Sequence, residues 1–88
     1  MKEFKDLIFE TRDGPYALSG KQAIILFDNG YGASIITSPS FYLGYEIAIL
    51  KGDIDGYSIC YNTSIANETL SFDSKNDITH IMKLIQEL

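Results

Sequence analysis

Few residues of this chain have the type and spacing that catalysis or metal binding requires. His80 is the only histidine and Cys60 the only cysteine, so neither has a second ligand at the spacing of a zinc site. Cys60 is expected in a strand, as a small packed residue rather than a nucleophile, because His80 is the only histidine that could activate it. We therefore predict that the protein is not an enzyme and binds no cofactor and no metal.

Two short motifs resemble ligand-binding loops only in part. The stretch 53–56, Asp-Ile-Asp-Gly, begins like a calcium loop but lacks the third oxygen ligand and a terminal Glu at the correct distance, so we interpret it as a solvated turn. The stretch 30–32, Gly-Tyr-Gly, is expected at a hairpin tip, where no helix N-terminus follows to hold a phosphate. Neither motif predicts a ligand.

The remaining polar candidates are expected mainly in the strands. Glu46 interrupts an apolar strand; if buried, its carboxylate needs a partner such as Lys21 or a tyrosine hydroxyl, and otherwise it is solvated at a sheet edge. The chain has six tyrosines, more than a core of this size requires, and tyrosine is favoured in recognition surfaces. The candidate binding residues are therefore Tyr31, Tyr42, Glu46 and Tyr61.

A β-hairpin centred on Asn29-Gly30 organises the elements that must position these residues. Asn and Gly tolerate the positive φ of a two-residue type I′ loop, so strands are expected at about 21–28 and 31–38. This loop would place Phe27 opposite Gly32. One face of the hairpin would then carry Ile24, Leu26, Ala33 and Ile35. The other face would carry Ala23, Ile25, Phe27 and Ile36. Both faces are apolar, so each needs a cover.

The C-terminus has the clearest helical pattern. Its apolar residues recur at helical spacing, and Ser74 is a good N-cap. The residues of this face are Ile78, Ile81, Met82, Ile85 and Leu88. Further elements are expected in the order of a helical turn at 2–6, an extended piece at 7–10, a loop at 11–20, strands at 45–50 and 57–62 joined by a polar connection at 51–56, and an irregular segment at 63–73 anchored by Ile65, Leu70 and Phe72.

These patterns predict an α+β fold in a single domain spanning residues 1–88. About four antiparallel strands form its β-sheet, and the C-terminal helix packs on one face. A chain of 88 residues with 45% hydrophobic and 22% charged residues is typical of a globular protein.

The charge and the cysteine count limit the partners and the compartment. The formal net charge is −5, which argues against direct binding of nucleic acid because a phosphate backbone attracts basic surfaces. A single cysteine forms no intramolecular disulfide. The N-terminus has acids where a signal peptide needs an apolar core, and no apolar run approaches the length of a membrane span. We therefore predict a cytoplasmic protein without a membrane partner.

Three stretches, in the same order along the chain, resemble a family of small bacteriophage and prophage proteins. Residues 27–36 are similar to that family's F-x-N-G-Y-G-x-S-hydrophobic hairpin, 42–50 to its Y-G-x-x-E-hydrophobic-A-V-L strand, and 59–65 to its L-C-Y-D-T-P-I stretch. Asn62 and Ser64 stand where the family has Asp and Pro, and the approach to Gly44 is shorter. The resemblance implies a phage or mobile-element origin and no particular activity.

The function expected from these features is that of a non-enzymatic phage or mobile-element accessory protein that binds a host protein. Inhibition of a host defence system is one form of it, by occlusion of a surface. Two alternatives are a small-ligand or nucleotide-binding oligomeric module and a minor structural protein of a phage particle. A homodimer is predicted, across the uncovered sheet face or by edge-strand pairing. The alternative is a monomer in which the N-terminal segment covers the second face of the sheet.

Overall fold

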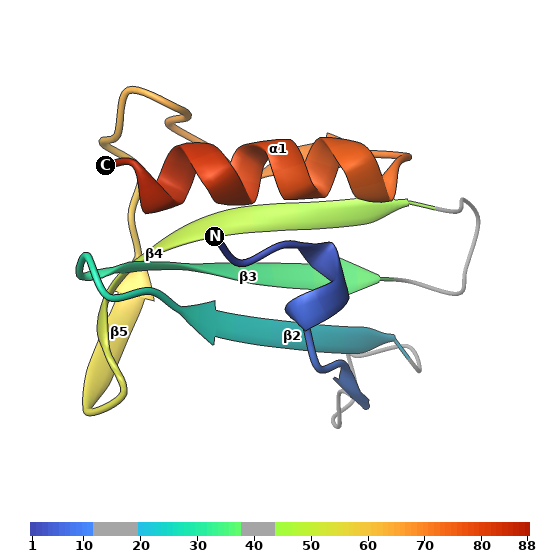
Figure 1. Cartoon of the computed structure of the whole chain (residues 1–88), viewed down its shortest axis with the longest axis horizontal. Helices are drawn as coiled ribbons and strands as arrows, with labels where there is room; N and C mark the ends of the chain where they lie inside the picture. The colour runs from blue at the N-terminus through green and yellow to red at the C-terminus, as the bar shows by residue number, and fades with distance from the viewer. Residues whose placement is uncertain (12–19, 38–43) are drawn as a thin grey trace.

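The computed structural model describes residues 1–11, 20–37 and 44–88. It confirms the α+β fold: a curled antiparallel sheet with one C-terminal helix packed against it (Figure 1). The elements are the 3-10 helix η1 (Phe4–Asp6), the strands β1 (Glu10–Thr11), β2 (Lys21–Leu26), β3 (Tyr31–Thr37), β4 (Tyr45–Asp53), β5 (Gly56–Ile59) and β6 (Leu70–Phe72), and the helix α1 (Lys75–Gln86).

Within the described residues the sheet has six strands, where about four were expected. Its order is β1-β2-β3-β4-β5, and β6 also pairs with β4. The long strand β4 has two antiparallel partners along one edge, because β6 pairs with residues 45–47 and β5 with residues 50–53. The two strands that the sequence did not indicate, β1 and β6, have only two and three residues, too few for an alternating pattern to be visible.

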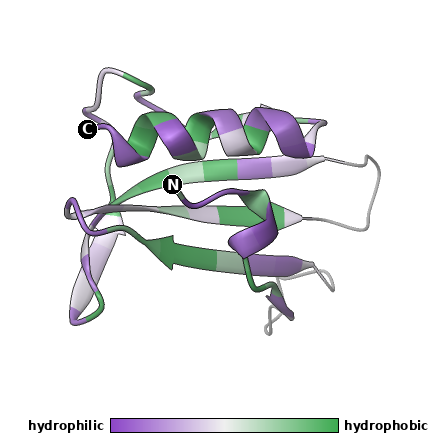
Figure 2. Cartoon of the chain, viewed as in Figure 1, coloured by the Kyte–Doolittle hydropathy of each residue, from purple (hydrophilic) through white to green (hydrophobic). Residues whose placement is uncertain are grey.

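The helix α1 forms as its pattern predicts. The Ser74 hydroxyl accepts a hydrogen bond from the N–H of Asn76 at 3.0 Å, which caps the first turn. Hydrophilic and hydrophobic residues alternate along the helix (Figure 2), and its apolar side packs onto β3 and β4. The buried residues of the core that results are Ala33, Ile35, Ile47, Ile49, Ile78, Ile81, Met82 and Ile85.

The central hairpin forms, but its predicted two-residue loop and register were wrong. Residues 28–30 form the loop: the N–H of Phe27 donates to the carbonyl of Tyr31 at 2.8 Å, and Gly30 has φ +84°. Three-residue loops of this kind place glycine last in a left-handed conformation. The register therefore shifts by one residue, so Leu26 lies opposite Gly32. Because of this shift, one face of the hairpin lies on the helix side and carries Ala23, Ile25, Phe27, Ala33 and Ile35. The opposite face carries Ile24, Leu26 and Ile36.

The loop differs because Asn29 is engaged elsewhere. Its Nδ2 donates to the carbonyl of Ile85 at 2.8 Å and to that of Leu88 at 3.4 Å. Ile85 lies in the last turn of α1, where carbonyls lack the usual intrahelical partner, and Leu88 follows the helix. The hairpin tip is thus tied to the end of the helix, a contact between residues 56 positions apart that local turn preferences do not contain.

The N-terminal segment covers the same face as α1, so its expected role as a cover for the second face was wrong. The N–H of Phe4 donates to the Thr79 hydroxyl at 3.0 Å, and Phe4, Leu7 and Phe9 pack against the core beneath α1. Ile65, Leu70 and Phe72 pack against this core as well, as predicted for anchors of the 63–73 segment. Both candidate covers therefore lie on the helix side.

The opposite face of the sheet is only partly buried. Ser34, Ala48 and Leu50 are buried on it, whereas Ile24 is 43% exposed. The amide of Gln22 donates to the Ser34 hydroxyl at 2.8 Å, which satisfies the buried polar group of this face. We refer to it as the helix-free face.

Candidate functional site

The four binding residues predicted from the sequence do not form one site. Tyr31 is half-buried on the helix side, where the Lys51 ammonium lies 5.8 Å from the centre of its ring. Glu46 pairs with Ile36 and Ser71 on the helix-free face and is half-buried. Tyr61 is exposed just after β5, and Tyr42 lies outside the described residues. Alternation along the strands thus separates Tyr31 from Glu46.

The reactive side chains of the described chain are also dispersed. The half-buried thiol of Cys60 donates to Oδ1 of Asn62 at 2.9 Å, and His80 is exposed on α1. Among residues 1–11, 20–37 and 44–88, no group of three or more His, Cys, Asp or Glu side chains is placed to hold a metal ion.

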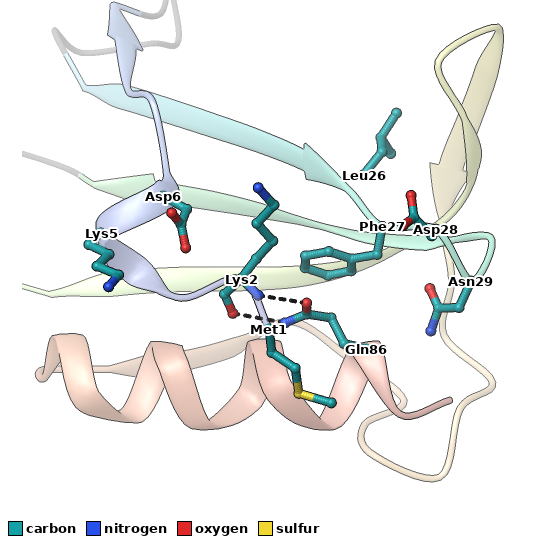
Figure 3. A pocket seen from close by; sticks show the side chains of 9 residues that line it. All are labelled: Met1, Lys2, Lys5, Asp6, Leu26, Phe27, Asp28, Asn29 and Gln86. Atoms are coloured by element: carbon teal, nitrogen blue, oxygen red, sulfur yellow. Dashed lines mark hydrogen bonds between the residues drawn. The ribbon is translucent and has the colours of Figure 1, made fainter.

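A hollow of about 630 Å³ lies between the N-terminal segment, the end of β2 and the end of α1 (Figure 3). We call it the N-terminal hollow. Phe27 points from the β2–β3 turn toward the N-terminal segment, whereas Leu26 points to the opposite side. Its lining residues are Met1, Lys2, Lys5, Asp6, Leu26, Phe27, Asp28, Asn29 and Gln86. Its charged side chains are two lysines and two aspartates, and the α-ammonium group belongs to Met1, which also lines the hollow.

One wall of this hollow is held by a pair of hydrogen bonds to the backbone of Lys2. Gln86 accepts from the N–H of Lys2 through Oε1 and donates to its carbonyl through Nε2, both at 2.8 Å (Figure 3). Gln86, Thr79 and Lys83 lie outside the helical spacing of the apolar face, which by itself would leave them facing solvent. Instead these residues bind the N-terminal segment: Lys83 lies 3.3 Å from the Glu3 carboxylate.

A second, smaller hollow of about 380 Å³ lies at the other end of α1. Its lining residues are Gly44, Tyr45, Ser71, Phe72, Asp73 and Asp77. The two carboxylates are exposed and come from a turn and the first turn of a helix. Such acids stabilise a helix N-terminus and do not by themselves indicate a ligand.

The strongest surface feature is the hairpin formed by the end of β4, β5 and the residues after it. We call residues 51–61 the arm. It turns away from the other strands at one end of the sheet (Figure 1). Ile54 is 88% exposed, Tyr57 44%, Ile59 49% and Tyr61 52%. Four of the eight exposed large hydrophobic side chains in the described residues thus lie in this arm.

The arm contains a tight turn where a longer polar connection was expected, so that prediction was wrong. Asp53 pairs with Gly56 across a two-residue turn, and the Asp53 carboxylate accepts the N–H of Asp55 at 2.9 Å, as Asp side chains do in turns. Gly52 has φ +133°, a conformation open to glycine, and its N–H donates to the Gly30 carbonyl at 2.9 Å. The stretch 53–56 is thus an exposed turn, as predicted.

The arm is an apolar surface with an acidic tip. Asp53 and Asp55 flank Ile54 at the tip, while Tyr57 and Ile59 belong to the helix-free face because Ile59 pairs with Leu50. Large apolar groups left exposed side by side are typical of interaction sites, and tyrosine is enriched among the residues that dominate binding energy. Sequence reasoning identified Tyr61 but missed Ile54, whose position between two acids was the available signal.

Comparison with known proteins adds no further assignment. A scan against protein-family models, a search of curated proteins and a search of solved structures each gave no match. In the described part of the chain, no helix has the length and apolar character needed to cross a bilayer. Function therefore has to be inferred from the arm, the N-terminal hollow and the charge of the chain.

Proposed function

We propose that this chain is a non-enzymatic protein-binding module that contacts a partner protein through its arm. The observation that supports the proposal most directly is the exposure of Ile54 at 88%, between two carboxylates and next to a row of half-exposed apolar side chains. An apolar anchor with an acidic rim fits a pocket bordered by basic residues. The net charge of −5 also attracts a basic partner at long range, before the two proteins come into contact.

The partner in this proposal is a host protein, and the chain is a bacteriophage or mobile-element accessory protein. The resemblance of residues 27–36 to phage-encoded hairpins supports this origin. Basic pockets are common where proteins bind nucleic acid, so an acidic arm would compete for such a pocket. Inhibition of a host defence system by stoichiometric occlusion is the concrete form that we propose.

The test is affinity capture from a bacterial host lysate with matched variants. We expect the wild-type chain to retain one host protein in stoichiometric amount and Ile54→Ser to lose it, because the change removes the anchor without adding charge. Ile8→Ser is the control, since Ile8 is 79% exposed but lies outside the arm. Equal retention of the partner by Ile54→Ser would contradict binding through the arm.

A second candidate function is the binding of a small anionic ligand, such as a nucleotide, in the N-terminal hollow. The observation that favours it is that Lys2, Lys5 and Phe27 line one space of about 630 Å³, a volume in the range of small-molecule sites. Native mass spectrometry of the purified protein with added ATP tests it. Binding that is lost in Lys2→Ala would support this function, and the bare protein mass at every ATP concentration would exclude ATP as its ligand.

A further inference from the structure

The outer edge of β5 is an open sheet edge. The strand order ends at β5, and in the described ranges β4 is the strand that pairs with it. All four residues of β5 are exposed, so no other segment among residues 1–11, 20–37 and 44–88 covers the strand. An edge of this kind presents unpaired backbone groups to any strand that approaches it.

The hydrogen-bond pattern identifies which backbone groups point outward. The N–H of Cys60 donates to the Ile49 carbonyl at 2.8 Å, so these residues form a hydrogen-bonded pair. In an antiparallel ladder such pairs alternate, which makes Ser58 with Lys51 the next one. Tyr57 and Ile59 lie between hydrogen-bonded positions, so their N–H and C=O groups face away from β4.

This edge lacks the features that usually keep a sheet edge unpaired. Residues 56–61 contain no charged residue and no proline, whereas exposed edges are commonly blocked by lysine, proline or a bulge. Tyr57 and Ile59 add half-exposed apolar side chains on one face. The edge is therefore suited to pair with another uncharged strand.

We propose that β5 pairs antiparallel with β5 of a second copy of this chain, across a two-fold axis at Ser58. The outward-facing groups of Tyr57 would then pair with those of Ile59 of the partner subunit, and the reverse pair follows by symmetry. Aromatic and β-branched side chains placed opposite each other stabilise a sheet. The two five-strand paths would join into one continuous sheet.

Charge favours the antiparallel arrangement of two copies over a parallel one, which would place their acidic tips side by side. The tip of each arm carries Asp53 and Asp55. With Ser58 on the axis, the two Asp55 residues lie six strand positions apart, or about 20 Å at roughly 3.4 Å per residue. This exceeds the Debye length of about 8–10 Å, so the acidic tips do not repel each other strongly, while Ser58, on the axis, is uncharged.

The area available sets the expected strength of the dimer. Tyr57, Ile59 and Tyr61 are each about half exposed. Because a whole aromatic side chain buries roughly 150–250 Å², these side chains and the strand edge offer roughly 500 Å² per copy, or about 1,000 Å² in total, the lower limit for a specific interface. We therefore expect a dimer that dissociates in the micromolar range.

Sedimentation equilibrium across the micromolar range tests the assembly. We expect a mass that rises from 9.9 kDa toward twice that value as concentration increases. Ile59→Lys should weaken the dimer by about tenfold or more, because it removes two cross-strand pairs and places a lysine on the edge. Ile8→Lys, the same change at an exposed site elsewhere, should leave the dimer unchanged. A mass of one chain at every concentration, or equal association of both variants, would overturn the proposal.

Disulfide trapping tests the register independently of stability. Residues directly opposite in a non-hydrogen-bonded pair have Cα atoms about 4.5 Å apart, within the range that a disulfide bridges. In a Cys60→Ala background, Ser58→Cys should therefore form a cross-linked dimer on mild oxidation. Ser64→Cys, an exposed serine outside the arm, should not. A dimer in solution without the Ser58→Cys cross-link would show that a different surface forms it.

The dimer goes beyond the proposed binding of a host protein and is separable from it. The paired arms would present Tyr57 and Ile59 of both copies on the helix-free face, with Ile54 at each end. Ile54 lies in the turn, outside the paired strands. Ile54→Ser should thus lose the host partner while keeping the Ser58→Cys cross-link, so failure of either proposal is distinguishable from failure of the other.

Discussion

The helix side of the sheet and the arm use the same kinds of residue with opposite outcomes. Beneath α1, alternate strand residues such as Ile35 and Ile47 are almost wholly buried because the helix, η1 and the 63–73 segment all pack there. In the arm, Ile54 and Ile59 remain exposed, although β5 continues the same sheet. The difference lies in coverage, since α1, η1 and the 63–73 segment pack on the helix side and not on the arm.

This contrast separates stability from recognition. Burial of apolar area is the main favourable term in folding, so the helix side carries most of the stability of the chain. An exposed apolar side chain contributes little to folding, yet it is available to a partner. We therefore expect substitutions on the helix side to change unfolding and substitutions in the arm to change association.

The largest expected effect compares two isoleucines, one from each region. Ile35→Ala should lower the free energy of unfolding by about 2–5 kcal/mol, because the side chain is fully buried and its removal leaves a cavity. Ile54→Ala should change it by less than about 0.5 kcal/mol, as is usual for exposed sites. Urea unfolding followed by circular dichroism measures both values.

The measured values for these two variants can contradict the expected difference between the helix side and the arm. A loss for Ile54→Ala as large as that for Ile35→Ala would mean that the arm is packed against something in solution. Because association through the arm would itself stabilise the folded state, the measurement should be repeated at several protein concentrations. An effect independent of concentration would place the added packing within one chain.

The two regions also differ in how far the sequence predicts them. The helix and its buried face follow from the spacing of Ile78, Ile81 and Ile85 and from the Ser74 cap, which are local properties. The hairpin follows from Asn29-Gly30, but its register does not, since the Asn29 side chain binds carbonyls at the end of α1.

The candidate site was harder to predict from the sequence, because it depends on the hairpin register and on which side chains remain exposed. A one-residue shift in register changes which residues of β2 share a face with which residues of β3. A face predicted from the turn alone therefore groups the wrong residues. In the arm, the acids around Ile54 suggested a long connection, whereas the Asp53 carboxylate closes a two-residue turn by accepting the N–H of Asp55. Which apolar residues stay exposed depends on what covers them, and alternation does not encode this.

A second comparison uses one glycine from the central strands of the sheet and one from the arm. A Cβ at Gly32 would lie 2.5 Å from the Ile25 carbonyl oxygen and 2.8 Å from Cδ2 of Leu26. Gly32→Ala should therefore destabilise the whole fold by about 1–3 kcal/mol through overpacking, measured by urea unfolding.

The matched change in the arm is Gly52→Ala. Gly52 has φ +133°, and a Cβ there would collide with the Gly56 carbonyl and the backbone of Tyr57, so strain of about 1–3 kcal/mol falls on the β4–β5 pairing. Hydrogen exchange should show faster exchange at the Cys60 amide, which bonds to Ile49, with little change in core amides. Equal loss of protection throughout the core would show that the arm does not open independently.

A smaller effect is expected where the hairpin tip meets the helix end. Asn29→Ala removes the hydrogen bonds donated to the carbonyls of Ile85 and Leu88 and should cost about 0.5–1.5 kcal/mol. Asn29→Asp should cost about 0.3–1 kcal/mol more, because it places a negative charge at the negative end of the helix dipole. Urea unfolding at low and high salt tests this, since salt should reduce the difference between the two variants.

The smallest expected effect concerns the ion pair that joins the N-terminal segment to the helix. Lys83 lies 3.3 Å from Glu3, and their side chains are 44% and 35% exposed, so water screens the attraction and the coupling should be only about 0.2–1 kcal/mol. A double-mutant cycle with Lys83→Met and Glu3→Gln measures this coupling, and salt should diminish it.

The uncharged hydrogen bonds of Gln86 and Thr79 with the same segment do not depend on salt in this way. Gln86→Ala should therefore cost a similar amount at low and high salt. A coupling between Lys83 and Glu3 well above this range and insensitive to salt would instead make the ion pair the main attachment of the N-terminal segment to α1.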